Sequence, residues 1–316
     1  MLHLTEGDVA QLLTMKDALR EVEAALRDLG EGKAENLPRQ RVRGPHALLN
    51  VMPASWPSRG YYGFKYYSIS RESVHFWFHL FDAKSGELLA VMQASRLGQQ
   101  RTGAASGIAT KFLARSEASE AALLGTGWQA ESQLEALCAV RPITHIRCYS
   151  RERALRQAFA ERMTKSLGVD VAAAESPEAA VRQAEIVITA TNSKDPVVRG
   201  EWLEPGVHLN AMGGNHIEAR ELDDAAIQRC TFIMADSIEQ ARLEAGDLVD
   251  PISRGLLRWD QVHELAEVVA GKSKGRRMAG DTTLFKSLGL AIEDVAVGSL
   301  IYERAREQKI GTEIAL

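Results

Sequence analysis

The chain has 316 residues, of which 45% are hydrophobic and 25% are charged, and its formal net charge at pH 7 is −4. This length leaves room for two domains, and the composition is that of a globular protein. The slight acidic excess argues against nucleic acid as the main partner, because phosphate backbones bind basic surfaces.

The expected cellular location follows from the apolar segments, the N-terminal residues and the cysteines. No apolar run approaches the roughly 20 residues that cross a bilayer, and Glu6 and Asp8 lie where a signal peptide would be apolar. Cys138, Cys148 and Cys230 are odd in number and widely spaced, which is typical of free thiols in a reducing compartment. We therefore expect a cytoplasmic protein that does not bind membranes.

The first part of the chain predicts a helix followed by strands. Residues 14–29 have an apolar helical face, and Thr14 can cap this helix with Asp17 three residues on. Four later segments are rich in aromatic or β-branched residues, or alternate in polarity: 47–52, 61–70, 74–81 and 88–94. These segments predict a mostly antiparallel sheet.

The pattern changes after this sheet. Residues 96–113 predict a long helix whose many small side chains would pack closely against another element. Strands are then predicted at 118–124, 145–150, 169–172, 186–191, 207–211 and 231–235, and helices at 128–140, 151–167 and 177–183. A last helical region is predicted at 281–306. This alternation indicates an α/β fold with a parallel, doubly wound sheet.

A glycine turn joins the strand at 118–124 to the helix at 128–140. Gly125 would let the backbone turn, Gly127 has no side chain to keep a diphosphate away, and Ala130 allows close packing. Backbone N–H groups and the positive helix end would hold the diphosphate. An ordinary strand-to-helix turn is the alternative. Trp128 is expected to cover the first helical turn. The predicted cofactor-binding segment is Gly125, Thr126, Gly127, Trp128, Gln129 and Ala130.

The end of the next strand decides between cofactors. In a doubly wound fold it faces the adenosine ribose, where an acidic residue suits NAD and arginine suits the 2′-phosphate of NADP. Here Ser150, Arg151 and Arg153 follow the strand. We therefore predict NADP(H), with NAD(H) possible, although a helix start with surface arginines would look the same.

Two other strand ends carry small and polar residues. Carboxyl ends of parallel strands border the ligand crevice of such folds, so these residues are predicted to line the nicotinamide side. Each segment alone equally describes a polar turn. The residues are Thr191, Asn192, Met212, Gly213 and Asn215.

Three histidines are candidates for proton transfer or metal binding. His216, beside Asn215, is an alternative proton donor or a surface residue. His75 and His79 would share one face of a strand, but no third ligand neighbours them, so no metal site is predicted.

The sequence resembles the ornithine cyclodeaminase/μ-crystallin family over almost its whole length. Eight blocks in the family's order carry the resemblance: Val51–Ala54, Tyr62–Lys65, Arg101–Ala105, Gly125–Ala130, Ala190–Ser193, Asn210–Asn215, Arg220–Asp223 and Phe285–Asp294. The last block is similar to the family's closing helix.

The resemblance implies a Rossmann domain inserted into a second, α+β domain. On this basis we expect residues 116–291 to bind the dinucleotide, and residues 1–115 with 292–316 to bind substrate and form a homodimer. The resemblance also implies three cationic anchors: Arg39, Lys65 and Arg101. Arg41 is a rival to Arg39, because one gap in the alignment would exchange them.

The chemistry of these anchors suits an amino or imino acid. Two guanidinium groups can grip a carboxylate. Lys65 would be partly desolvated in its strand of aromatic residues, and desolvation lowers a lysine pKa, as a proton donor to an imine requires.

Two positions depart from the cyclodeaminases of the family. Those enzymes carry an Asp as acid–base group where this chain has Asn215, and a Glu for the substrate's distal amine where this chain has Asn50. An amide cannot accept a proton at neutral pH. Hydride transfer is unaffected, because the nicotinamide performs it.

The resemblance and these departures imply an oxidoreductase with Lys65, Arg101 and Asn215 at its catalytic centre. We expect NAD(P)H-dependent reduction of a small α-imino acid or cyclic ketimine carboxylate, or the reverse amino-acid dehydrogenation. One alternative is an ornithine or lysine cyclodeaminase that recycles bound NAD. The other is an NADPH-bound protein that binds small ligands with little turnover.

Overall fold

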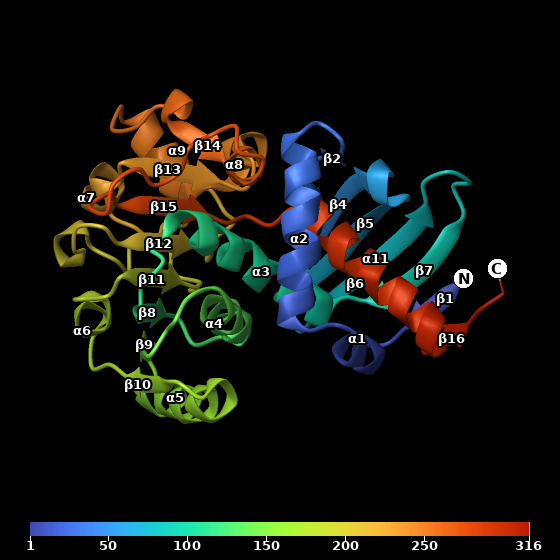
Figure 1. Cartoon of the computed structure of the whole chain (residues 1–316), viewed down its shortest axis with the longest axis horizontal. Coiled ribbons are helices and arrows are strands. Elements are labelled where there is room, and N and C mark those ends of the chain that lie inside the picture. Colours follow the sequence, from blue (N-terminus) through green and yellow to red (C-terminus); the bar gives the residue numbers. More distant parts are fainter. Residues whose placement is uncertain (316) are drawn as a thin grey trace. The chain divides into compact units, whose positions relative to one another are not determined.

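The chain forms two structural units in the computed structural model, which describes residues 1–315 (Figure 1). The first unit contains Met1–Ala105 and the chain from Gly289 onward, and the second contains Ser106–Leu288. Helix α3 (Ser95–Leu113) begins in the first unit and ends in the second. Among the described residues, no helix is both long and apolar enough to span a membrane.

The first unit is built on an eight-stranded sheet. Its order is β16-β1-β7-β6-β5-β4-β2, with β3 also paired to β4, and every pairing is antiparallel except β1 with β7. The strands are β1 (Leu2–Leu4), β2 (Glu35–Asn36), β3 (Gln40–Arg43), β4 (Ala47–Trp56), β5 (Tyr61–Ser70), β6 (Val74–Asp82), β7 (Leu88–Gln93) and β16 (Thr312–Glu313). The predicted mostly antiparallel sheet is confirmed.

Helices cover one face of this sheet. Figure 1 shows α2 (Met15–Gly30) and α11 (Ala291–Gln308) lying across the strands, and α11 packs on β4, β5 and β6. The predicted cap is present, because the Thr14 side chain accepts a hydrogen bond from the Asp17 backbone N–H at 3.2 Å. A short helix α1 (Glu6–Leu12) and a 3₁₀ turn η1 (Pro57–Arg59) complete the unit.

The strand period of two places alternate side chains of β5 on opposite faces. Gly63, Lys65 and Tyr67 are buried beneath the helices, whereas Phe64 and Tyr66 are only partly buried on the other face. Lys65 therefore lies on the core side of the sheet, which is an unusual place for a lysine.

The second unit contains a sheet of eight parallel strands in the order β10-β9-β8-β11-β12-β15-β13-β14. The strands are β8 (Glu120–Leu124), β9 (His145–Tyr149), β10 (Asp170–Ala173), β11 (Ile186–Thr189), β12 (His208–Ala211), β13 (Phe232–Ala235), β14 (Val262–Glu264) and β15 (Thr283–Lys286). The order reverses direction between β8 and β11, which is the switch point where such sheets bind ligands.

Helices lie on both faces of this sheet, and two apolar cores result. The helices are α4 (Trp128–Val140), α5 (Arg153–Leu167), α6 (Pro177–Val181), α7 (Asp224–Arg229), α8 (Ile238–Glu244), α9 (Gly246–Ser253) and α10 (Leu265–Val269), with 3₁₀ turns η2 (Gly200–Trp202) and η3 (Trp259–Gln261). Because both faces are covered, β11, β12 and β15 are buried at every residue. The predicted doubly wound α/β fold is confirmed.

The predicted helical region 281–306 was wrong in its first part. Thr283–Lys286 forms β15 between β12 and β13, and the helix begins only at Ala291. A short apolar run can be a buried strand or a helix segment, and its periodicity does not distinguish them. Gly289, with φ +83°, separates the strand from the helix.

Candidate functional site

The glycine turn after β8 has the geometry that its sequence predicts. Gly125 has φ +98°, its backbone N–H donates to the Tyr149 carbonyl at 2.8 Å, and a Cβ there would collide with the Ala190 carbonyl. A side chain at Gly125 is therefore excluded both by its own backbone conformation and by the backbone of Ala190.

Gly127 has a different role in the same turn. It is the N-cap of α4, no side chain caps that helix, and a Cβ at this glycine would meet nothing within 4 Å. The helix start thus faces open space, where a diphosphate could approach the first backbone N–H groups and the positive helix end. Ala130 is fully buried, Gln129 is partly buried, and Trp128 is 47% exposed.

These two glycines predict two separable substitution effects. Gly125→Ala is expected to lower the free energy of unfolding by about 2 kcal/mol or more, because the φ is strained and the Cβ collides with backbone. Gly127→Ala is expected to cost at most about 1 kcal/mol but to weaken dinucleotide binding about tenfold or more. Urea unfolding and calorimetric titration measure both quantities. Unchanged dinucleotide affinity in Gly127→Ala would contradict the assignment of this turn.

The segment after β9 presents arginines to solvent. Arg151 and Arg153 are exposed, and Arg153 lies 3.7 Å from Glu175. Ser150 accepts a hydrogen bond from the Thr126 hydroxyl at 2.8 Å, which ties this segment to the glycine turn. Arg156 was not predicted: it is buried, it stacks 5.2 Å from the Tyr149 ring centre, and it donates to the Ser150 carbonyl at 3.1 Å.

The predicted residues after β11 and β12 meet at one buried carboxylate, that of Glu221. Its oxygens accept hydrogen bonds from the Thr191 backbone N–H at 2.8 Å and the Gly213 backbone N–H at 2.8 Å. Burial raises the pKa of Glu221, and a nearby lysine, Lys286, opposes that rise. Asn192 and Met212 flank these bonded positions; Asn192 is exposed and Met212 is partly buried. Asn215 and His216 are exposed further along the loop, so their predicted roles stay predictions.

The three predicted cationic anchors lie in the first unit. Lys65 Nζ is 2.8 Å from Asp294 Oδ1, and Arg101 Nε is 3.1 Å from the same oxygen. Arg101 Nη1 is 2.8 Å from Glu293 Oε2. Both carboxylates stand in the first turn of α11 and are fully buried. The prediction did not include Glu293 or Asp294.

Arg39 and Arg41 differ in burial. Arg39 is 6% exposed, its guanidinium lies 6.0 Å from the Tyr67 ring centre, and its Nε is 3.5 Å from Met52 Sδ. Arg41 is half-buried in β3 opposite Asn50. Arg39 is also close enough to lower the pKa of Lys65. These observations favour Arg39 as the anchor.

The electrostatics of the cluster suit an anionic ligand. Desolvation, and then the charge of Arg101, lower the pKa of Lys65 to about 8, while Asp294 opposes the change. Lys65, Arg101 and Arg39 carry three positive charges against the two negative charges of Glu293 and Asp294. The cluster therefore has one net positive charge, which a single carboxylate would neutralise.

Buried polar atoms of the first unit also point to a ligand. Asn50 is 1% exposed on the same face of the sheet as Met52, and neither its amide oxygen nor its amide nitrogen has a hydrogen-bond partner. Asp294 Oδ2 is likewise buried and unbonded. An unsatisfied buried polar atom costs about 1–3 kcal/mol, and a bound polar molecule would remove that cost.

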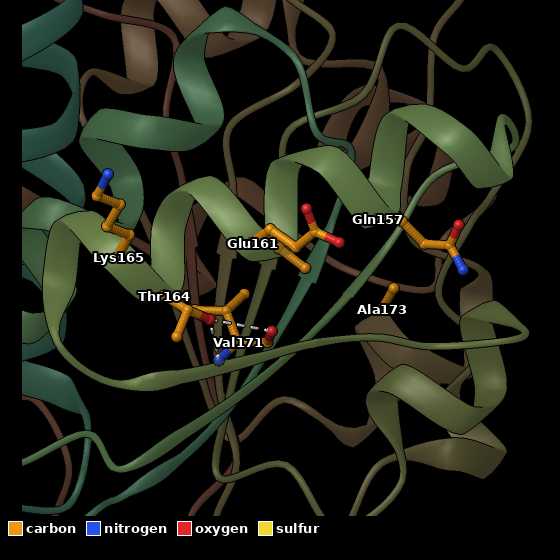
Figure 2. Close-up of a pocket in the computed structure, with 7 residues that line it drawn as sticks. Gln157, Glu161, Thr164, Lys165, Val171 and Ala173 are labelled. Atoms are coloured by element: carbon orange, nitrogen blue, oxygen red, sulfur yellow. Dashed lines mark hydrogen bonds between the residues drawn. The ribbon is translucent and has the colours of Figure 1, made fainter.

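Figure 2 shows a hollow elsewhere in the second unit, between α5 and the edge strand β10. Its volume is about 510 Å³, and Thr164 bonds the Val171 backbone N–H at 3.0 Å along its wall. It is lined by Gln157, Ala160, Glu161, Thr164, Lys165, Val171 and Ala173, none of which was predicted for the site.

Comparison with known proteins gives consistent matches over the chain. The model of the ornithine cyclodeaminase/mu-crystallin family matches residues 1–309. A Delta(1)-pyrroline-2-carboxylate reductase of Bacillus cereus is 39% identical over 247 residues, which are 78% of this chain and 76% of that protein.

Two solved structures are similar over their whole length. The Thermococcus litoralis Delta(1)-pyrroline-2-carboxylate reductase, in complex with NADH and L-proline, has a TM-score of 0.95 and 37% identity and covers 99% of this chain and 100% of its own. An archaeal alanine dehydrogenase dimer with bound NAD has a TM-score of 0.94 and 34% identity and covers 100% of this chain and 99% of its own.

Proposed function

Because the chain belongs to the ornithine cyclodeaminase/mu-crystallin family, we propose that it is an NAD(P)H-dependent reductase of small α-imino acids or cyclic ketimine carboxylates. The reverse reaction is the oxidative dehydrogenation of an amino acid. The observation that carries the proposal is the buried cluster of Lys65, Arg101 and Arg39, with its one net positive charge.

The cluster supplies what an imino acid needs from a protein. Arg101 and Arg39 would bind the carboxylate, and that anion would neutralise the net charge of the cluster. Lys65, with its pKa near 8, is mostly protonated at neutral pH yet gives up its proton more readily than an ordinary lysine. It would donate that proton to the imine nitrogen.

Reduction also needs a hydride donor, and a nicotinamide dinucleotide supplies the hydride when bound. The residues present fit such a cofactor: the uncapped helix start at Gly127 faces open space, and the tight turn at Gly125 admits no side chain. Thr191, Asn192, Met212 and Gly213 would border the nicotinamide, at the strand ends beside the switch point.

We assign NADP(H) as the preferred cofactor and keep NAD(H) as possible. Ser150, Arg151 and Arg153 stand where the adenosine ribose would bind, and both arginines are exposed. The two solved structures described above contain NADH or NAD, which supports NAD(H) as a possible cofactor of this chain.

Arg151→Asp tests the preference. The substitution is expected to weaken NADPH binding about tenfold or more and NADH binding by less than about threefold, because only NADPH carries the 2′-phosphate. Fluorescence titration with each nucleotide gives the two affinities. Equal losses for NADPH and NADH would contradict the assignment.

The substrate proposal rests on Asn50. A buried amide can hydrogen-bond a polar substrate group but cannot neutralise a distal ammonium, so substrates with small or uncharged side chains are favoured. The exposed Asn215 cannot take the acid–base role of a carboxylate. Both residues therefore argue against an ornithine cyclodeaminase. Ammonia release from ornithine without net nucleotide consumption would overturn this choice.

The aromatic face of the first unit's sheet is our proposed dimer surface. Tyr62 stacks on Phe81 at 5.1 Å, Phe64 stacks on His79 at 4.8 Å, and all four rings are only partly buried. A partly exposed cluster of this kind is typical of association surfaces, and one similar protein is a dimer. Sedimentation at micromolar concentration should show a homodimer that Phe64→Asp dissociates; a monomeric native protein would contradict this assignment.

A further inference from the structure

The buried Glu221 carboxylate gathers four hydrogen-bond donors from two loops and a strand end. Oε1 accepts from the Thr191 backbone N–H at 2.8 Å and the Thr191 hydroxyl at 2.7 Å. Oε2 accepts from the Thr189 hydroxyl at 2.6 Å and the Gly213 backbone N–H at 2.8 Å. Each carboxylate oxygen thus holds two donors, and the side chain spans the ends of β11 and β12.

A second layer of charges holds Glu221 itself. Asp247 Oδ1 accepts from the Glu221 backbone N–H at 2.7 Å and from the Leu222 backbone N–H at 3.0 Å. Asp247 Oδ2 is 2.9 Å from Lys286 Nζ, which also donates to the Gly213 carbonyl at 2.7 Å. Asp247 and Lys286 are fully buried, so this second layer lies in a low-dielectric interior.

The position of this network separates it from an ordinary structural carboxylate. Glu221 acts at the carboxyl ends of β11 and β12, beside the switch point of the sheet. Glu185 performs a similar task at the opposite edge: just before β11, it accepts from the Ser119 backbone N–H at 2.7 Å and the Glu120 backbone N–H at 3.1 Å. Only the carboxyl ends face the crevice where these folds bind dinucleotides.

We propose that Glu221 is a positioning residue, which clamps the loops after β11 and β12 in the one conformation that receives the nicotinamide half of the dinucleotide. The proposal rests on the proposed function, because it deepens the cofactor assignment. Glu221 itself would not contact the cofactor. Its effect passes through Thr191 and Gly213, whose loops it joins.

The clamp requires a carboxylate rather than any polar side chain. Two backbone N–H groups point at different oxygens of Glu221, one from Thr191 and one from Gly213. A glutamine presents one oxygen and one NH₂ group, so one of these N–H groups would lose its acceptor and face a donor. Glu221→Gln therefore keeps the size of the side chain but releases one loop.

The experiment compares a whole cofactor with a fragment that lacks nicotinamide. Calorimetry measures two pairs of dissociation constants: NADPH against its fragment 2′-phospho-adenosine diphosphoribose, and NADH against its fragment adenosine diphosphoribose. Each pair is measured for the full-length native protein, for Glu221→Gln and for the control Glu185→Gln. Circular dichroism and thermal unfolding are recorded for each. We expect Glu221→Gln to weaken the intact dinucleotides about tenfold or more and the fragments less than about twofold, whereas Glu185→Gln lowers the melting temperature but leaves the ratio of the two affinities unchanged.

The outcomes separate the clamp from the proposed function. If the native protein binds no nicotinamide dinucleotide, the proposed function fails. If it binds, but Glu221→Gln weakens dinucleotide and fragment equally or neither of them, the clamp is overturned and the proposed function stands. If Glu221→Gln does not fold, Thr189→Val takes its place, because it removes one donor and keeps the carboxylate. A selective loss of about two- to threefold is then expected, and equal or absent losses overturn the clamp.

Discussion

Replacing Lys65 with methionine is expected to lower turnover by about 10²- to 10⁴-fold, the usual contribution of a positioned general acid. The dissociation constant of the nicotinamide dinucleotide should change by less than about threefold, because Lys65 belongs to the cluster of the first unit and the glycine turn to the second. Methionine is chosen because Lys65 is 2% exposed and a shorter side chain would leave a cavity. Stopped-flow turnover and fluorescence titration measure the two effects.

The native protein should show the titration of this lysine in its pH profile. The pKa of Lys65 is lowered from 10.5 to about 8, and the protonated form is the donor. The kcat/KM for reduction should therefore be level below pH 8 and fall about tenfold per pH unit above it. Asp294 holds that pKa up, so Asp294→Asn should move the fall to lower pH. A Lys65→Met variant with native turnover, or a native profile without this fall, would remove Lys65 from the reaction.

Replacing Arg101 with methionine is expected to lower the free energy of unfolding by about 3–5 kcal/mol, as for other broken buried ion pairs. Arg101 forms ion pairs with Glu293 and Asp294, which are both fully buried. Its loss removes both of these ion pairs, and the Lys65–Asp294 ion pair remains. The same change should raise the KM for the imino acid, because a guanidinium that would bind its carboxylate is gone. Urea unfolding and initial-rate kinetics measure the two effects.

A surface pair in the same unit provides the control. Arg59 and Glu303 are 2.7 Å apart, with side chains 37% and 38% exposed, so Arg59→Met should cost less than about 1 kcal/mol. Adding Glu293→Gln to Arg101→Met should restore part of the lost stability, because it removes a buried charge that has lost the Arg101 guanidinium. If Arg101→Met is as stable as Arg59→Met, the buried ion pairs of Arg101 do not contribute the expected free energy of unfolding.

Much of the fold followed from local patterns. The helix Trp128–Val140 and the strand Tyr61–Ser70 have the bounds that their periodicity predicts, because glycines, caps and alternating residues act over a few positions. The strand Thr283–Lys286 was assigned to a helix because four buried residues carry no period. Its place between β12 and β13 depends on tertiary packing, which a local pattern does not contain.

The site was predictable only where a residue type is unusual for its segment. Lys65 in a strand of aromatic residues and the two glycines of the turn are such cases. Glu293 and Asp294 are not, because acids in a first helical turn ordinarily complement the helix dipole at the surface. Glu221 lies in one of the blocks that carry the family resemblance, but its local sequence does not predict its hydrogen-bond partners, which lie up to 32 positions away along the chain.

Imine reduction by this protein is tested by nucleotide consumption with preformed Δ¹-pyrroline-2-carboxylate, measured for the purified native protein and for Lys65→Met. We expect steady oxidation of NADPH, and slower oxidation of NADH, with formation of the cyclic amino acid, and a rate about 10²-fold or more lower in the variant. The contradicting result is no nucleotide oxidation with this or any other small cyclic imine, nor with keto acids plus ammonia, while ornithine releases ammonia without net change in the nucleotide.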